Sequence, residues 1–244
     1  MPDPILELSN VTKTFGGLTA VNDVGFQVRR GEIFGVAGPN GSGKSTMFNC
    51  ITGIPFGPTR GDIRFKGAPI HNLRPHQIFR RGLSRTFQKD AEFPDLSARE
   101  TTALGAHFAA GLRGGAMRDA TEEALDLVGF DPVRRDMETA DLSVYQKKQL
   151  MIASALVTRP DILMLDEPAS GLTRPEIAEL DALLLRVNRH GVTILIIEHV
   201  LGLLLSVSQR LLVLNHGAVL MEGDPQTVIR DDRVVEAYIG GATV

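Results

Sequence analysis

The spacing of hydrophobic and polar positions divides the chain into three regions. Up to about residue 88, apolar residues alternate with polar ones or form short runs between turns, as in "ILELSNVTKTF" and "IFGVAG", which predicts strands. From about residue 89 to residue 159 the spacing becomes helical, most clearly in "RDATEEALDLVGF". After residue 160, apolar runs such as "ILMLD" and "TILIIEH" alternate with helical patterns. Strands that alternate with helices indicate a largely parallel sheet, so the pattern predicts an α/β core with a helical insertion.

Local signals predict the ends of several elements. A Ser or Thr followed three residues later by Glu or Gln predicts a helix start, because each side chain can bond the other's backbone N–H. Three pairs fit: Ser97 with Glu100, Ser143 with Gln146, and Thr173 with Glu176. The stretch "RLLVLNHGAVLMEG" predicts a hairpin, and "TVIRDDRVVEAYIG" predicts one last helix over 227–240.

Composition narrows the class of protein. The 244 residues are 43% hydrophobic and 23% charged, the balance of a globular protein. The formal net charge of -3 gives no general attraction to nucleic acid. The longest apolar runs are interrupted by Glu198 and His199 and are too short for a membrane span, and the first residues lack the features of a signal peptide. Cys50 is the only cysteine, which excludes an internal disulfide, fits a reducing cytoplasm and predicts a small core residue.

The strongest chemical signal is "GPNGSGKST", residues 38–46, which follows a predicted strand and opens a predicted helix. Glycines in such a loop let backbone N–H groups turn toward phosphate oxygens, and the helix N-terminus adds a positive dipole end. Lys44 is expected to bind the β- and γ-phosphates, and the Ser45 hydroxyl to hold Mg²⁺. The predicted nucleotide-binding residues of this loop are Gly38, Asn40, Gly41, Ser42, Gly43, Lys44, Ser45 and Thr46.

A second signal is "ILMLDEP", an apolar strand that ends in two adjacent carboxylates. A lone Asp-Glu pair at a strand end is usually a solvated turn. In a chain with a phosphate loop, however, Asp166 suits the ligand shell of Mg²⁺, and Glu167 can polarise the attacking water.

These motifs occur in a distinctive order. The phosphate loop is followed by "SRTFQ" ending at Gln88, by Leu-Ser-x-x-Gln at 142–146, by "LMLDEP", and by His199 after the next apolar strand. Over about residues 6–241 the chain resembles the ATP-binding subunits of ABC transporters. The resemblance implies one α/β domain over 1–244 with the ABC ATPase fold. Residues 1–88 and 160–244 are expected to form the P-loop NTPase core, with a mixed, largely parallel sheet and an antiparallel β lobe, and residues 89–159 the helical subdomain that carries the signature.

The resemblance also implies roles for residues near the nucleotide. Phe15 is expected to stack on adenine, and Gln88 to contact Mg²⁺ and a transmembrane subunit. Glu167 matches the general base, and His199 matches the histidine that holds the γ-phosphate and the water. Other interpretations remain for three of these residues: Phe15 as a core aromatic, Gln88 as a surface amide and His199 as a structural histidine.

The signature departs from the family pattern. Ser143, Tyr145 and Gln146 are expected to meet the nucleotide held by an opposite ATPase subunit. Where the family usually has two glycines, or in some members an aromatic residue followed by glycine, this chain has Val144 and Tyr145. Tyr145 brings a Cβ and a ring into a space that the usual glycine leaves open. We therefore expect a weakened half-site. The loop "ASGL", residues 169–172, matches the segment that crosses the dimer interface.

Softer cues point to a subfamily. The stretches "FGGLTAVNDV", "RRGLSRTFQ", "IIEHV" and "VVEAYIGG" resemble importers of the branched-chain amino acid type. This implies an ATPase that uses ATP and Mg²⁺ to power small-solute uptake at the cytoplasmic face of the inner membrane. The implied partners are a second ATPase subunit, identical or different, transmembrane permease subunits and, indirectly, a solute-binding protein, with no nucleic acid.

Several alternatives remain open. The same ATPase pattern could serve urea or amide uptake, lipid or polysaccharide export, or a regulatory module that does not hydrolyse ATP. A soluble ABC protein acting on ribosomes or DNA is disfavoured, since those usually carry two cassettes or long inserted arms.

Overall fold

The computed structural model describes residues 4–86 and 93–240. By contact clustering the chain forms two compact units. Unit 1 comprises residues 1–81 and 193–244, and unit 2 comprises residues 82–192. The division at residues 88 and 160 that the sequence suggested stays a prediction.

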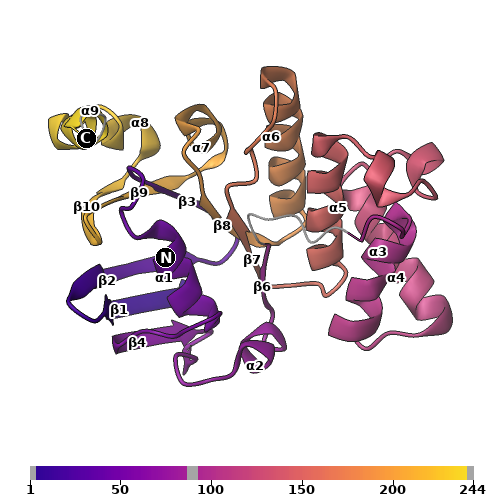
Figure 1. Ribbon diagram of the computed structural model, residues 1–244, viewed down its shortest axis with the longest axis horizontal. Helices are drawn as coiled ribbons and strands as arrows, with labels where there is room; N and C mark the ends of the chain where they lie inside the picture. Colours follow the sequence, from indigo (N-terminus) through magenta and orange to yellow (C-terminus); the bar gives the residue numbers. More distant parts are fainter. Residues whose placement is uncertain (1–3, 87–92, 241–244) are drawn as a thin grey trace. The chain divides into compact units, whose positions relative to one another are not determined.

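Unit 1 contains an antiparallel sheet in the order β2-β1-β4-β5 (Figure 1). Apolar residues at alternate positions of its long strands are buried; Leu8, for example, lies opposite Phe26 on one side and Ile63 on the other. This is the antiparallel β lobe that the sequence predicted. Its strands are β1 (Pro4–Phe15), β2 (Leu18–Arg29), β4 (Arg60–Phe65) and β5 (Ala68–Pro69).

A second set of strands in unit 1 runs in the order β10-β9-β3-β8. Here β3 pairs in parallel with both β8 and β9, while β10 is antiparallel to β9. Every residue of β3 and β8 is buried, which explains why all of them except Thr193 are apolar or glycine. The β9–β10 hairpin turns at His216 and Gly217, both at positive φ, as tight hairpin turns require. The bounds are β3 (Ile33–Ala37), β8 (Thr193–Ile197), β9 (Arg210–Asn215) and β10 (Ala218–Gly223).

The end of unit 1 corrects one prediction. The single helix expected over 227–240 is two helices, α8 (Pro225–Val228) and α9 (Asp232–Gly240). Asp231 breaks the helix because its carboxylate accepts a hydrogen bond from the Arg233 N–H and so favours a new start. The other helices of unit 1 are α1 (Lys44–Thr52), α2 (Pro75–Phe79) and α7 (Leu201–Val207).

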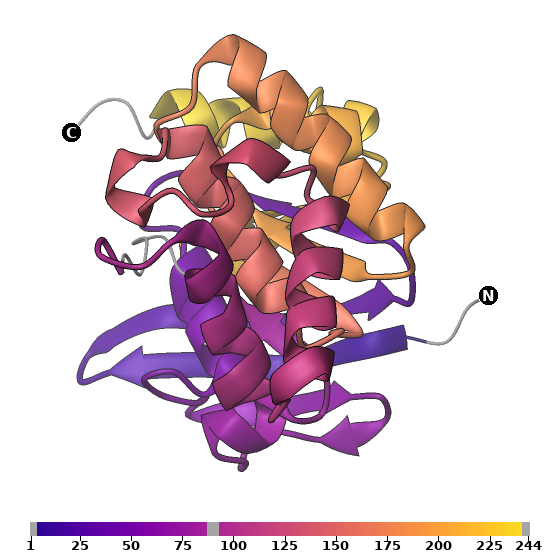
Figure 2. The same cartoon turned by 90° about the vertical axis from the view of Figure 1, so that its right-hand side faces the viewer.

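Unit 2 combines two parallel strands with a group of helices. Strand β6 (Leu83–Arg85) pairs with β7 (Ile162–Asp166). Helices α3, α4 and α5 pack against one another, and Figure 2 turns them toward the viewer. The helical segments are α3 (Ala98–Leu104), a π-helical turn (Gly105–Ala109), α4 (Gly114–Leu127), 3₁₀ turns at Pro132–Arg134 and Thr139–Asp141, α5 (Val144–Leu156) and α6 (Arg174–Arg189).

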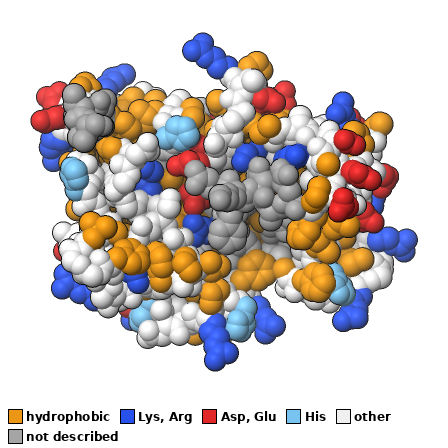
Figure 3. Space-filling view, in the orientation of Figure 1, with side chains coloured by type: hydrophobic (Ala, Val, Ile, Leu, Met, Phe, Trp, Pro, Cys, Tyr) orange, Lys and Arg blue, Asp and Glu red, His pale blue; other side chains and the backbone are white. Residues whose placement is uncertain are grey.

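The predicted helix starts are confirmed. Helices α3, α5 and α6 begin at capping boxes built on Ser97, Ser143 and Thr173. The predicted fold class is confirmed as well, since the chain combines parallel and antiparallel strands with helices. In the part of the chain that the structure describes, no helix has both the length and the apolar character needed to cross a membrane. Acidic side chains gather over the helices of unit 2, at the right of Figure 3.

Candidate functional site

The phosphate loop lies between β3 and α1 in unit 1. Gly43 adopts φ +100°, and a Cβ there would lie 2.4 Å from the carbonyl oxygen of Ala20, so no larger residue fits without a shift. Gly43 is also the N-cap of α1, where the structure shows no side-chain capping bond among the described residues. The N-terminus of α1 lies directly after this glycine-rich loop, and its positive dipole end is suited to bind an anion.

Lys44 is buried against the loop that precedes it. Its Nζ donates to the carbonyl oxygens of Gly38, at 2.7 Å, and of Pro39, at 3.0 Å. These bonds hold the ammonium over the loop, where it adds a positive charge to the backbone donors. Ser45 is exposed and Thr46 half-buried at the start of α1.

His199 lies at the same edge of the strands as the phosphate loop. Val36 of β3 is paired with Ile197 of the parallel strand β8. Gly38 lies two residues after Val36, and His199 lies two residues after Ile197, so both follow the carboxyl ends of neighbouring parallel strands. The imidazole is half exposed, with its Nδ1 3.7 Å from Oε2 of the fully buried Glu198. Because that carboxylate also accepts the N–H groups of His199 and Val200, it orders the turn that carries the histidine.

Phe15 ends β1 with 43% of its surface exposed, which excludes the core-aromatic interpretation. Its ring meets Phe56 edge to face, with centroids 4.9 Å apart, and the Lys13 ammonium lies 5.1 Å from its centroid. An exposed aromatic ring whose orientation is fixed by neighbours such as Phe56 and Lys13 is suited to stack on a base. Cys50, in contrast, is buried as expected, and burial raises the pKa of its thiol to about 11.

The two acidic residues lie at the end of β7 in unit 2. Asp166 is buried, and its Oδ2 accepts a hydrogen bond from the guanidinium of Arg85, also buried, at 2.7 Å. Its Oδ1 is buried with no hydrogen-bond partner among the described residues. A buried carboxylate oxygen without a donor fits a Mg²⁺ ion or a water bound to one. Glu167 adopts φ +49°, a strained conformation for a non-glycine residue, which is common at functional sites.

The signature forms the N-terminus of α5. Ser143 is exposed; its Oγ accepts from the Gln146 N–H at 3.2 Å, and Gln146 Oε1 accepts from the Ser143 N–H at 3.0 Å. The hydroxyl hydrogen of Ser143 can still be donated to an anion. Tyr145 is half-buried, and burial, followed by the charge of Glu179 on α6, raises its pKa to about 12.

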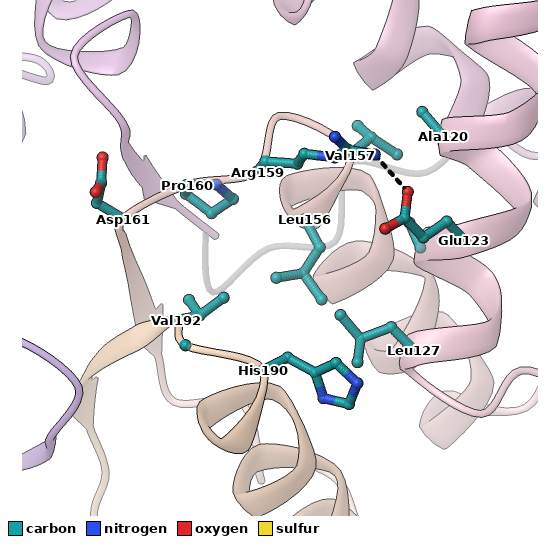
Figure 4. A pocket seen from close by; sticks show the side chains of 12 residues that line it. Ala120, Glu123, Leu127, Leu156, Val157, Arg159, Pro160, Asp161, His190 and Val192 are labelled. Atoms are coloured by element: carbon teal, nitrogen blue, oxygen red, sulfur yellow. Dashed lines mark hydrogen bonds and ion pairs between the residues drawn. The ribbon is translucent and has the colours of Figure 1, made fainter.

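A separate cavity in unit 2 does not suit a nucleotide. It has a volume of about 340 Å³ and is lined by aliphatic side chains, among them Leu127, Leu156 and Val192, together with the polar side chains of Glu123, Asp161 and His190 (Figure 4). The guanidinium of Arg159 at its rim is paired with Glu123 at 2.7 Å. A cavity with this lining lacks the convergent donors that a triphosphate needs. Gln88, the remaining predicted site residue, lies outside the described residues.

The sequence model of the ABC transporter family matches residues 21–170. The chain belongs to the ABC transporter family. It is 40% identical to the high-affinity branched-chain amino acid transport ATP-binding protein BraF of Pseudomonas aeruginosa, over 99% of this chain and 100% of BraF. It is 37% identical to the corresponding protein LivG of Escherichia coli K12, with the same coverage.

Solved structures of ABC cassettes are similar to this chain. The ADP conformation of an ATP-binding cassette of an ABC transporter is similar to it with a TM-score of 0.90 and 29% identity, over 98% of this chain and 99% of that one. A dimeric cassette bound to ADP and Pi is similar with a TM-score of 0.79 and 27% identity, over 90% and 98% of the two chains. ADP and ATP are thus ligands of this family.

Three residues that the motifs did not single out as site residues contact predicted site residues. Arg85 pairs with Asp166, Glu198 orders the turn at His199, and the Tyr238 hydroxyl accepts the N–H of Gly38. The sequence does offer a signal for Glu198, because this charged residue lies between two apolar runs, where a buried charge usually has a specific partner. The other two contacts join segments 81 and 200 residues apart, and no local pattern indicates them.

Proposed function

We propose that this chain is the ATP-hydrolysing subunit of an importer of small solutes, with branched-chain amino acids as the favoured class. One observation carries the ATPase assignment: parallel strands β3 and β8 bring the Lys44 loop and His199 to one edge. The names of the relatives BraF and LivG support the class of solute. The ADP-bound cassettes of the same fold support the nucleotide.

In this proposal different residues of the chain bind the phosphates, the base and the metal ion of MgATP and catalyse its hydrolysis. The loop N–H groups and Lys44 bind the phosphates, and Phe15 stacks on the base. Glu167 accepts the proton of the attacking water, and His199 holds the γ-phosphate. Ser45, Gln88 and Asp166 are the proposed ligands of Mg²⁺, which when bound neutralises charge that develops on the phosphates.

A second cassette completes each nucleotide site. Ser143, at the exposed start of α5, is proposed to donate to a nucleotide held by the phosphate loop of another ATPase subunit, identical or different. The dimeric cassette among the similar structures supports such a pair. Permease subunits are proposed to contact the region of Gln88 at the cytoplasmic face of the membrane, and a solute-binding protein acts through those permeases.

Reconstitution tests the whole proposal. The chain would be purified with its proposed partners, two permease subunits, a second ATPase subunit and a solute-binding protein, and placed in liposomes that enclose ATP. We expect ATP-dependent uptake of labelled leucine, isoleucine or valine, abolished by Glu167→Gln. Uptake of urea or short amides instead would replace the proposed solute, and efflux of a lipid would replace import.

A further inference from the structure

The last helix of unit 1 contacts the phosphate loop. Tyr238 lies on α9, and its hydroxyl oxygen accepts a hydrogen bond of 2.8 Å from the N–H of Gly38, 200 residues away along the chain. Gly38 is the first glycine of the loop and follows the last residue of β3. The bond therefore forms where the chain leaves the strand and enters the nucleotide-binding loop.

Gly38 is tightly confined at this point. It adopts φ +147°, and a Cβ there would lie 2.2 Å from the carbonyl oxygen of Leu214, at the end of β9. Its own carbonyl oxygen accepts the 2.7 Å bond from Lys44. Both backbone polar groups of Gly38 are thus engaged, the N–H by Tyr238 and the C=O by the lysine that is proposed to bind phosphate. A shift of Gly38 would move the acceptor that holds Lys44.

The helix stands apart from the rest of the loop. A cavity of about 570 Å³ is lined by residues 39–42 of the loop, by residues of the β9–β10 hairpin, and by Arg233, Glu236 and Ala237 of α9. The Tyr238 hydroxyl instead reaches the loop at its first glycine. A tyrosine hydroxyl is protonated at neutral pH, and burial raises the pKa of this one further. Loss of the Tyr238 hydroxyl would remove the acceptor of the Gly38 N–H. Because Gly38 is buried, water could not easily replace that acceptor, and the N–H would be left unsatisfied at a cost in free energy.

We propose that Tyr238 is a positioning residue for the nucleotide: through Gly38 it fixes the place of Lys44 and so sets the affinity for MgATP. This inference rests on the proposed ATPase function. It assigns to the C-terminal helix a role in nucleotide affinity, exerted through one phenolic oxygen. A change in the position of α9 would be transmitted to the loop through the same bond.

Tyr238→Phe tests the proposal because it removes only the oxygen. In calorimetry with the full chain, we expect the Kd for MgATP and for ADP to rise about 3- to 10-fold, the usual range for a lost hydrogen bond. Because the loop is altered before chemistry begins, KM should rise while kcat stays within about twofold. Val235→Ala is the matched control, since Val235 is exposed on the same helix. It should leave Kd unchanged.

Hydrogen exchange adds a measurement on the wild-type chain. The Gly38 amide should exchange slowly in the wild type and faster in Tyr238→Phe, with thermal midpoints that agree within a few degrees. Exchange of Gly38 at the rate of an unstructured peptide would overturn the inference. So would an unchanged Kd in Tyr238→Phe, or an equal loss in Val235→Ala. A wild-type chain that binds no MgATP would instead overturn the proposed function.

Discussion

The phosphate loop of unit 1 and the acidic strand end of unit 2 are positioned in different ways. Lys44 is held by carbonyl oxygens five and six residues before it, within one loop. Asp166 is held by Arg85, which lies 81 residues away in the sequence. The ammonium of Lys44 is thus held by the backbone of its own loop, whereas the Asp166 carboxylate depends on a side chain from another strand. Substitutions should therefore affect nucleotide affinity at the first region and fold stability or turnover at the second.

The largest expected effect is on turnover, at the acidic strand end. Glu167→Gln keeps the size of the side chain but removes the proposed base, so the ATPase rate should fall about 10²- to 10⁴-fold. MgATP should still bind, because the phosphate loop in unit 1 is unchanged. Steady-state phosphate release and calorimetry on the same preparation test both statements.

The same substitution also tests whether the two sites of a cassette pair are equivalent. If the partner's signature keeps its glycines, Glu167→Gln in this chain should remove most of the turnover of the assembled transporter. The matching change in a different partner should cost much less. Equal losses from the two changes would show that the two sites are equivalent.

The buried ion pair should have the next largest effect. Arg85→Met leaves the Asp166 carboxylate buried without its cation, and breaking such a pair usually costs about 3–5 kcal/mol in the free energy of unfolding. The side chains of this pair are only 6% and 5% exposed. Urea unfolding without nucleotide at pH 7 measures the loss.

Arg159→Met is the control for that experiment, because the Arg159–Glu123 pair lies in the same unit but is mostly exposed. Its loss should be below about 1 kcal/mol. If both substitutions lower the free energy of unfolding by the same amount, the Arg85–Asp166 pair is not what holds the Asp166 carboxylate in place.

A smaller effect is expected at the loop itself. Lys44→Ala removes the ammonium that is proposed to bind phosphate, and a charge-assisted hydrogen bond of this kind is worth about 10- to 100-fold in affinity. The fold should remain, since the loop is confined by Gly38 and Gly43. Titration with MgATP measures the loss, and Lys66→Ala, on the exposed turn after β4, should change nothing. Near-normal affinity in Lys44→Ala would remove the phosphate-loop assignment.

This contrast also explains what could be predicted from the sequence. The loop, the β9–β10 hairpin and the capped start of α5 depend on neighbouring residues, and their patterns predicted them. The pattern does not predict that the helix is interrupted before Asp232. An aspartate such as Asp231 within an amphipathic pattern is equally compatible with an exposed helical position and with an N-cap. The Arg85–Asp166 and Tyr238–Gly38 contacts were missed since they arise only when distant segments pack together.

The smallest expected effect concerns Tyr145, at the signature. The sequence predicted that its ring crowds the space where relatives have glycine. The ring is half-buried, and its hydroxyl is within electrostatic range of Glu176, Glu179 and Arg186, all on α6. A ring that contacts its own unit should crowd a nucleotide only partly. We therefore expect Tyr145→Gly to raise the ATPase rate of the assembled pair only about twofold, or about 0.4 kcal/mol of barrier.

Tyr145→Phe separates crowding from packing at this position. It keeps the ring beside α6 and loses only the hydroxyl, so the ATPase rate should match the wild type if the size of the ring is what matters. Because glycine in the first turn of α5 also lowers helix stability by up to about 1 kcal/mol, rates should be compared well below the thermal midpoint of each variant. A lower rate in Tyr145→Gly than in Tyr145→Phe would mean that the ring supports the signature helix and that this half-site is not weakened by crowding.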